Sequence, residues 1–339
     1  MKKFLKQFSV TLPLLLLLHA TLFAQDDNYY DATKGNKEKK YEFVKTKAVN
    51  KSYTVSSSDK LNIDNSFGKV EVTTWDKNEI KVDVSIEVSS NTQEYAQKLI
   101  DRITISENKS GKDINFKTDI KGMNNTGKEK STMVINYIIS MPAGNSLYVK
   151  NEFGNTLIPD MKGEVDFVTK FGKLTTGNLS NVKNINVEFG RADLGNIPGG
   201  NLNIKFSAAT ITKLSGNVKV NLEFSSKVTL NLDNKLDGLD LKASYSTVNL
   251  KPLGELPASY KIFSSFGSFK NRTSVKFNNA EDDDDNKREP KFYYEYNGKS
   301  GNGNIQVKVK SNFSTIILGE PTAEDMKGKD KKKQKTVTL

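Results

Sequence analysis

The sequence contains no cysteine, one tryptophan and a single histidine, His19, which lies near the N-terminus. The absence of cysteine excludes disulfide bonds, thiol nucleophiles and the lipid-anchored cysteine of a bacterial lipoprotein. After residue 24 the chain has neither histidine nor cysteine, which removes His-based catalytic triads and nearly all zinc or transition-metal sites. We therefore expect a protein that is not an enzyme and that carries no metal and no cofactor.

The sequence also lacks an apolar run long enough to cross a membrane. The run Leu12–Leu18 is well short of the roughly 20 residues that a transmembrane helix needs. It lies between the basic stretch Lys2–Lys6 and the small residue Ala24, which is the layout of a secretory signal peptide. We predict that residues 1–24 are a signal peptide, with no transmembrane segment after its cleavage. The mature protein would then reside in the periplasm, on the outer surface or in the medium.

Charge gives the next indication, because the formal net charge is +11 and much of the excess lies near the ends. Export argues against nucleic acid as a partner, and an envelope protein, a glycan or another anionic polymer fits the charge better. Residues 25–49 and the lysine-rich tail 321–339 lack a strand pattern, which predicts a disordered linker and tail. The acidic run Glu281–Asp285 lacks the turn glycine of a calcium loop, which favours a solvated loop over a Ca²⁺ site.

An aromatic residue followed by glycine or serine recurs at intervals of 17 to 21 residues in the second half of the chain. The copies are Phe153, Phe171, Phe189, Phe206, Phe224, Tyr245 and Phe266, with outlying copies at Phe67 and Phe313. Apolar residues alternate before each aromatic and resume out of phase after the small residue, so the chain should bend at the glycine or serine. We predict that the nine aromatics are structural and line a shared core. Antiparallel hairpins in sandwiches are the competing interpretation.

These repeats predict an all-β fold, a single-chain β-solenoid that resembles a parallel β-helix with about 18 residues per rung. The repeats would occupy residues 151–320. Residues 50–150 would form a β-rich N-terminal cap, with strands near 51–55, 61–63, 69–74, 80–88, 103–107, 113–119 and 132–141. One short helix is expected within this cap near Thr92–Arg102, with Asn91 as its N-cap.

Several stretches resemble a family of exported bacterial proteins called putative adhesins. The N-terminal stretch runs from Leu61 to Asp76 and continues through Ile80–Val84, and the C-terminal stretch comprises Gly301–Val309 and Phe313–Leu318. The helix Tyr95–Ile103 also resembles that family, so the similarity covers about residues 50–318. This resemblance implies a β-solenoid at the cell envelope, and it transfers no catalytic residues.

Carboxylates are the remaining candidates for catalysis. Glu188 and Glu223 each precede a repeat aromatic and should point outward two rungs apart, roughly 10 Å, which is wide for the acid pair of a glycosidase. We therefore expect a non-catalytic envelope or surface protein, an adhesin or a binding scaffold. A polysaccharide-active β-helix enzyme and a periplasmic regulatory scaffold are the alternatives, and no feature of the sequence specifies an oligomer.

Overall fold

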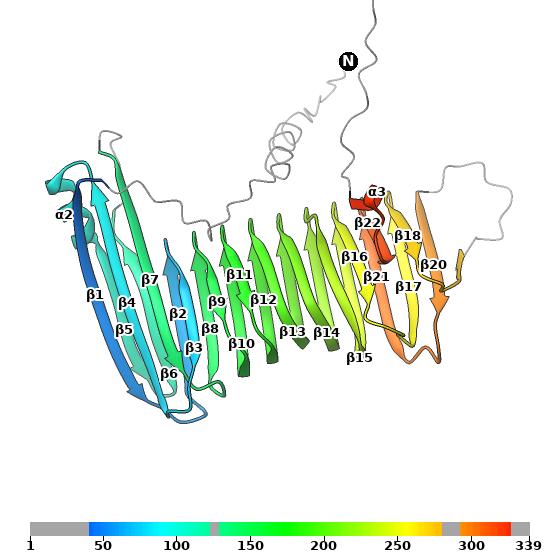
Figure 1. Cartoon of the computed structure of the whole chain (residues 1–339), viewed down its shortest axis with the longest axis horizontal. Coiled ribbons are helices and arrows are strands. Elements are labelled where there is room, and N and C mark those ends of the chain that lie inside the picture. The colour runs from blue at the N-terminus through cyan, green and yellow to red at the C-terminus, as the bar shows by residue number, and fades with distance from the viewer. Residues whose placement is uncertain (1–40, 123–128, 280–291, 327–339) are drawn as a thin grey trace, which may run out of the picture. The chain divides into compact units, whose positions relative to one another are not determined.

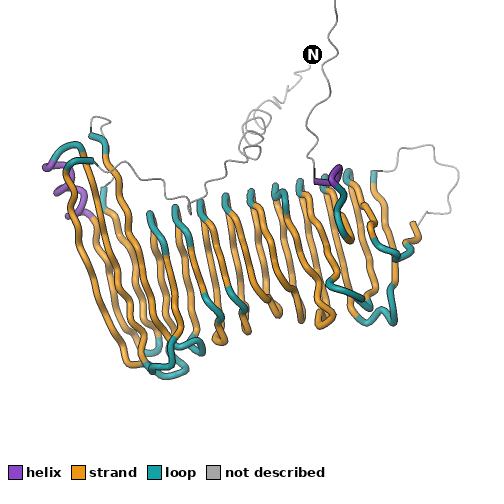
Figure 2. Tube along the Cα trace, viewed as in Figure 1, coloured by secondary structure: helices purple, strands orange, loops and turns teal. Residues whose placement is uncertain are grey.

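The computed structural model describes residues 41–122, 129–279 and 292–326, all of which belong to one compact unit, Glu38–Leu339. Strands dominate this unit (Figures 1 and 2), so the predicted all-β class is confirmed. Among the described residues, no helix is long and apolar enough to span a membrane. The expected signal peptide 1–24 and the acidic run Glu281–Asp285 lie outside the described residues.

The strands are β1 Phe43–Thr54, β2 Lys60–Ser66, β3 Val70–Thr74, β4 Glu79–Ser90, β5 Ile103–Ser110, β6 Asp113–Ile120, β7 Ser131–Met141, β8 Ser146–Glu152, β9 Thr156–Ile158, β10 Met161–Lys170, β11 Lys173–Thr176, β12 Leu179–Glu188, β13 Arg191–Lys205, β14 Ala208–Glu223, β15 Val228–Ser244, β16 Thr247–Pro252, β17 Ala258–Ser265, β18 Ser268–Arg272, β19 Phe277–Asn279, β20 Tyr293–Lys299, β21 Ile305–Asn312 and β22 Thr315–Gly319. The helices are α2 Gln93–Arg102 and α3 Ala323–Met326.

Parallel pairing organises the middle of the unit. Phe167 of β10 pairs with Ile185 of β12, which pairs with Leu202 of β13, which in turn pairs with Val220 of β14. These partners are 18, 17 and 18 residues apart, like the aromatic repeats in the sequence. Each turn of the chain, here called a coil, contributes one strand segment before its aromatic residue and another after it. The segments therefore form two series, which we call the first and the second layer.

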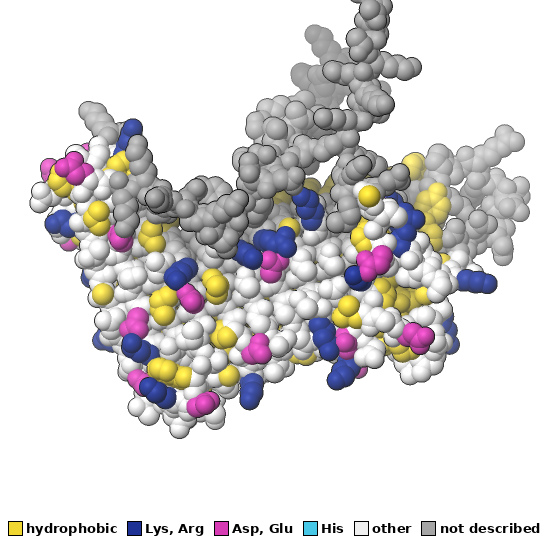
Figure 3. All heavy atoms as spheres, in the orientation of Figure 1, with side chains coloured by type: hydrophobic (Ala, Val, Ile, Leu, Met, Phe, Trp, Pro, Cys, Tyr) yellow, Lys and Arg dark blue, Asp and Glu magenta, His cyan; other side chains and the backbone are white. Residues whose placement is uncertain are grey.

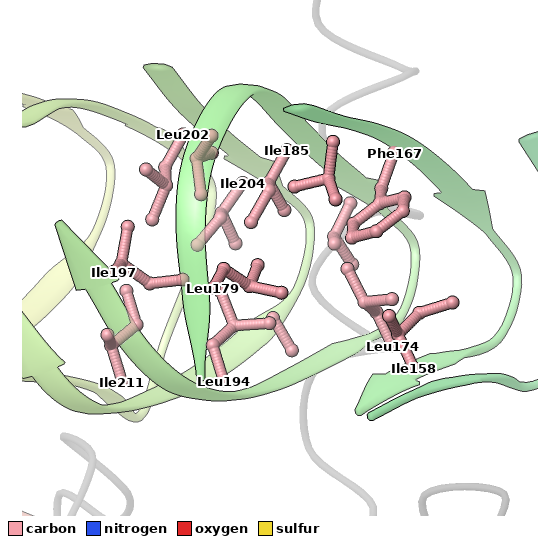
Figure 4. Packing of buried hydrophobic residues seen from close by; sticks show 14 of the residues in the cluster. Ile158, Phe167, Leu174, Leu179, Ile185, Leu194, Ile197, Leu202, Ile204 and Ile211 are labelled. Atoms are coloured by element: carbon pink, nitrogen blue, oxygen red, sulfur yellow. The ribbon is translucent and has the colours of Figure 1, made fainter. Parts of the chain in front are cut away.

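The core lies between the two layers. Inward residues alternate with outward ones along each strand, as in β12, where Ile185 and Val187 are fully buried and their neighbours are not. Figure 4 shows Ile185, Leu202 and Ile204 facing Leu194 and Ile211 across this interior. The apolar alternation in the sequence therefore corresponds to one continuous hydrophobic core.

Antiparallel strands and α2 close the N-terminal end of the core. Strand β7 pairs antiparallel with β4, and β4 pairs antiparallel with β1. Helix α2 buries Ala96, Leu99 and Ile100, so the predicted short helix in the cap is confirmed. Its N-cap is Thr92 and not Asn91, because the Thr92 hydroxyl accepts the Tyr95 N–H, while the Asn91 side chain accepts the Lys130 N–H.

The first strand begins earlier than the sequence predicted. Residues 43–49, expected to be disordered linker, belong to β1 and pair with β4, for example Phe43 with Ser90 and Val49 with Val84. Their lysines hid the strand, because β1 is an edge strand that bears charge outward and owes its conformation to its partner.

The coils at the C-terminal end do not follow chain order. Strand β21 pairs in parallel with β15 on one side and with β17 on the other, and β22 lies in the same way between β16 and β18. The last coil in the sequence is therefore inserted before the preceding one in space, as the orange strand β21 among yellow ones shows (Figure 1). Antiparallel β20 then covers the outer edge of β17.

Helix α3 is fastened to β18 by ion pairs, although the tail from residue 321 was expected to be disordered. The Asp325 carboxylate contacts Lys270 Nζ at 2.7 Å and Arg272 Nε at 3.0 Å, and its side chain is buried. It also accepts the Thr322 N–H at 3.0 Å, while the Asp325 N–H donates to the Thr322 hydroxyl. This reciprocal pair is a capping box that begins the helix.

Acidification provides a test of this fastening. Hydrogen bonds from Arg272, then from Lys270, hold the pKa of Asp325 well below its ordinary value. A lowered folded-state pKa gives stability that is present above the unfolded pKa, near 4, and is lost only as the pH falls through the folded value. We expect the backbone amide signals of Thr322 and Asp325 in NMR spectra to keep their neutral-pH positions below pH ~4. In the Asp325→Asn variant these signals should shift to random-coil positions at neutral pH, and unchanged spectra would contradict the assignment.

Candidate functional site: an exposed aromatic ladder

The nine repeat aromatics adopt a backbone conformation that side chains of this size rarely take. Their φ angles lie between 49° and 64°, in the left-handed region. The conformation is held by hydrogen bonds between coils, in which the N–H of Phe153 donates to the Lys170 carbonyl and that of Phe171 to the Glu188 carbonyl. A left-handed residue costs roughly 1–2 kcal/mol, so this strain recurs in every coil.

The left-handed turn sends the aromatic side chains outward, and the prediction that they line the core is wrong. Strict alternation would bury Phe189 after Val187, but Phe189 is 45% exposed and the small residue after it, Gly190, is buried instead. The bend therefore occurs at the aromatic, one residue earlier than expected. Phe67 is half-buried, and the eight others are 37–53% exposed.

The small residues form a column of close backbone contacts behind the aromatics. A Cβ atom on Gly154 would lie 1.8 Å from the Gly68 carbonyl oxygen, and one on Gly172 would lie 2.0 Å from that of Gly154. In the later coils buried serines take this place and link the coils, since the Gly190 N–H donates to the Ser207 hydroxyl and the Ser225 N–H to that of Ser246. Glycine and serine are therefore not interchangeable here, although both are small.

Stacking joins the nine rings into one continuous row, the aromatic ladder. In spatial order its members are Phe67, Phe153, Phe171, Phe189, Phe206, Phe224, Tyr245, Phe313 and Phe266. Neighbouring ring centroids are 4.8–5.1 Å apart with interplanar angles of at most 9°, which makes the ladder about 40 Å long. Phe292, which does not belong to the repeat, stacks on Phe266 at 5.1 Å.

The geometry decides which part of each ring a partner can touch. The faces of the seven inner rings are covered by their neighbours, so only ring edges are exposed. Sugars dock on open ring faces, whereas a row of edges presents a narrow apolar ridge. The ladder is therefore suited to contact with an apolar surface along its length.

Stacking alone does not account for this arrangement. Each aromatic pair contributes about 0.5–1.5 kcal/mol, which is similar in size to the strain of one left-handed aromatic. An exposed apolar row with repeated backbone strain is a feature of interaction surfaces more than of structural cores. We therefore treat the ladder as the candidate functional site.

Replacing one ring should accordingly cost little stability. Asparagine adopts left-handed φ more readily than phenylalanine, so in Phe189→Asn the relief of strain offsets the lost stacking. We expect the free energy of unfolding in urea to change by no more than about 1 kcal/mol. The matched control Val187→Asn, which buries an amide two residues away, should lose several times more. Equal losses would mean that the ladder serves stability alone.

Charged residues beside the ladder form a row of alternating sign, consisting of Glu152, Lys170, Glu188, Lys205 and Glu223. Lys170 pairs with Glu188 and Lys205 with Glu223, each at 3.2 Å. The two glutamates considered as a catalytic pair do point outward, but each is bound to a lysine. Paired carboxylates of this kind are expected on a β-sheet surface and do not indicate catalysis.

The second layer offers no raised carboxyl pKa either. Burial alone would raise the pKa of Asp193, but hydrogen bonds from Arg191 and Lys173 outweigh it, so the pKa lies below its ordinary value. A general acid needs the opposite shift. Within the described ranges, no group of three or more acidic, histidine or cysteine side chains could hold a metal ion. The hollows on the outer faces, over Gly200 and Gly238 and beside Arg191, are open and shallow.

Comparison with known proteins follows from this geometry. No family model and no curated protein matches the chain. Solved bacterial structures do match it. One is described as a putative adhesin from Bacteroides fragilis, with 14% identity and a TM-score of 0.41, over 80% of this chain and 97% of the other.

Two further structures come from Parabacteroides. A putative adhesin from Parabacteroides merdae has 11% identity and a TM-score of 0.38, over 83% of this chain and 98% of the other. A putative lipid binding protein from Parabacteroides distasonis has 11% identity and a TM-score of 0.34, over 82% and 98%. Two of the three carry the family name that the sequence resembles. At these TM-scores the matches carry no argument about function, which we base on the surface of this chain.

Proposed function

We propose that this chain is an exported, non-catalytic binding protein of the bacterial cell surface. In this proposal a β-solenoid with about 18 residues per coil holds the aromatic ladder as a straight ridge that contacts an apolar surface on the partner. The observation that supports it most directly is the outward, strained and continuous stack of nine rings. The ion-paired carboxylates and the absence of a deep cleft among the described residues favour binding over catalysis.

Binding of the fluorescently labelled protein to intact bacteria and to envelope fractions tests the role of the ladder. We expect the triple variant Phe171→Asn, Phe189→Asn and Phe206→Asn to bind at least about tenfold more weakly, since it interrupts the ridge at its centre. Lys98→Gln on α2, far from these rings in the sequence and on another element, serves as the surface control. If the triple variant folds and binds as tightly as the unchanged protein, the ladder is not the contact surface.

The non-catalytic part of the proposal has its own test. Incubation with a panel of polysaccharides should release no new reducing ends and no unsaturated sugars. Release of either product, abolished in Glu188→Gln or Glu223→Gln, would replace the proposal with a carbohydrate-active enzyme.

A further inference from the structure

One outward row of the first layer changes character near the C-terminal end of the stack. Asn186, Asn203 and Asn221 follow one another in register across neighbouring strands, and the next two positions are Lys242 and Lys310. These lysines are exposed, and neither forms an ion pair with any residue that the structure describes. Like charges directly opposite each other on adjacent strands are destabilising.

This pair contrasts with the alternating, ion-paired row beside the middle of the ladder. There each lysine has a glutamate neighbour, so the surface neutralises itself. At Lys242 and Lys310 the surface leaves two adjacent positive charges without a counterion among the described residues. Such an arrangement is complementary to an anion supplied by a partner.

Exposed aromatic rings lie directly beside the two lysines. Lys310 pairs in register with Phe263, whose ring lies 5.9 Å from that of Tyr293. Phe292 and Tyr293 are each 54% exposed, and Phe266, on which Phe292 stacks, is 53% exposed. Hydrophobic side chains also gather at the β17 end of the face shown in Figure 3, with basic side chains among them. We call this set the aromatic–lysine patch: Lys242, Lys310, Phe263, Phe266, Phe292 and Tyr293.

We propose that the aromatic–lysine patch binds the surface of an anionic lipid bilayer. Phenylalanine and tyrosine rings partition into the region between headgroups and acyl chains, and lysines place their ammonium groups among the lipid phosphates. A soluble anionic polymer would satisfy the two lysines but would leave the four rings in water. The inference rests on the proposed function and names the partner class at one end of the ladder.

Co-sedimentation of the full protein with vesicles provides the test. We expect binding to vesicles of equal parts phosphatidylglycerol and phosphatidylcholine, and little binding to phosphatidylcholine alone. Each lysine near an anionic surface contributes about a fivefold gain, so Lys242→Gln with Lys310→Gln should weaken partitioning by roughly 25-fold. Phe292→Ser with Tyr293→Ser keeps the charge and should weaken it by about tenfold.

The double variant Lys98→Gln and Lys130→Gln removes the same charge at the other end of the chain's fold and should bind vesicles like the unchanged protein. The proposal is overturned if no anionic vesicle is bound, or if this control loses as much as the patch variant. It is also overturned if the serine variant binds normally and dextran sulfate competes fully, since the patch would then be a polymer site. If vesicle binding survives while the Phe171, Phe189 and Phe206 triple variant still binds cells, the ladder proposal fails and the lipid inference stands.

Discussion

Gly154→Ala is expected to destabilise the protein more than any other change considered for this chain. The added Cβ would lie 1.8 Å from the carbonyl oxygen and 2.5 Å from the carbonyl carbon of Gly68 in the neighbouring coil. Backbone cannot rotate away as a flexible side chain can, so two coils must separate and their strand hydrogen bonds must lengthen. We expect a loss of at least about 4 kcal/mol in the free energy of unfolding, measured by urea denaturation.

Gly144→Ala is the matched control for this prediction. Gly144 has open space around its Cβ position, and its φ lies outside the left-handed region, so alanine should change stability by no more than about 0.5 kcal/mol. If both variants unfold at the same urea concentration, the coils are not in backbone contact at Gly154.

Ser246→Ala should give the second-largest loss. The Ser246 hydroxyl accepts the Ser225 N–H at 3.0 Å and donates to the Ser244 carbonyl at 2.8 Å, and the side chain is only 4% exposed. Alanine fits the space but leaves the buried N–H of Ser225 without its acceptor. An orphaned buried donor costs about 1–3 kcal/mol, so we expect a loss of about 2 kcal/mol on urea denaturation.

Ser226→Ala separates this effect from the general preference for serine in a turn. Ser226 follows Ser225 directly and is exposed, so its hydroxyl can bond to water in both variants. We expect no measurable change for Ser226→Ala. A similar loss for both substitutions would show that the serine column does not link the coils.

Strand positions were accessible from the sequence because each strand records its own burial. Alternation predicted the stretches near 61–63, 80–88 and 113–119, and the structure places β2, β4 and β6 over these residues with one to three more at the ends. Strand β1 was truncated, because its outward lysines carry no such signal. Local pattern predicts a strand only where one face is buried.

The direction of the aromatics could not be obtained in the same way. Two consecutive outward residues before the small residue, as in Glu188 and Phe189, produce the same phase shift as an inward aromatic followed by a bend. Hydrophobicity decided for the inward option, whereas the chain uses left-handed φ to place the ring outside. The signal that could have distinguished them is glycine at the next position, which leaves no side chain to fill the core at the corner.

The spatial order of the last coils was equally inaccessible. Phe263 and Phe266 both offered acceptable repeat spacings, and the structure selects Phe266, which stacks on Phe313. Nothing in the local pattern of β21 and β22 specifies that they precede β17 and β18 in space. That order depends on contacts between segments far apart in the chain.

The inserted C-terminal coil has a consequence for how the protein is made. A ribosome delivers β15 and β16 before their neighbours exist, and the bond from the Ser246 N–H to the Ser314 hydroxyl spans 68 residues. Coils up to that point can zip up in the order of synthesis, but the next place must stay vacant while β17 and β18 emerge. Assembly therefore ends with the C-terminal segment sliding into a reserved slot, and a product truncated before Ile305 would retain two unsatisfied strand edges, open to aggregation and proteolysis.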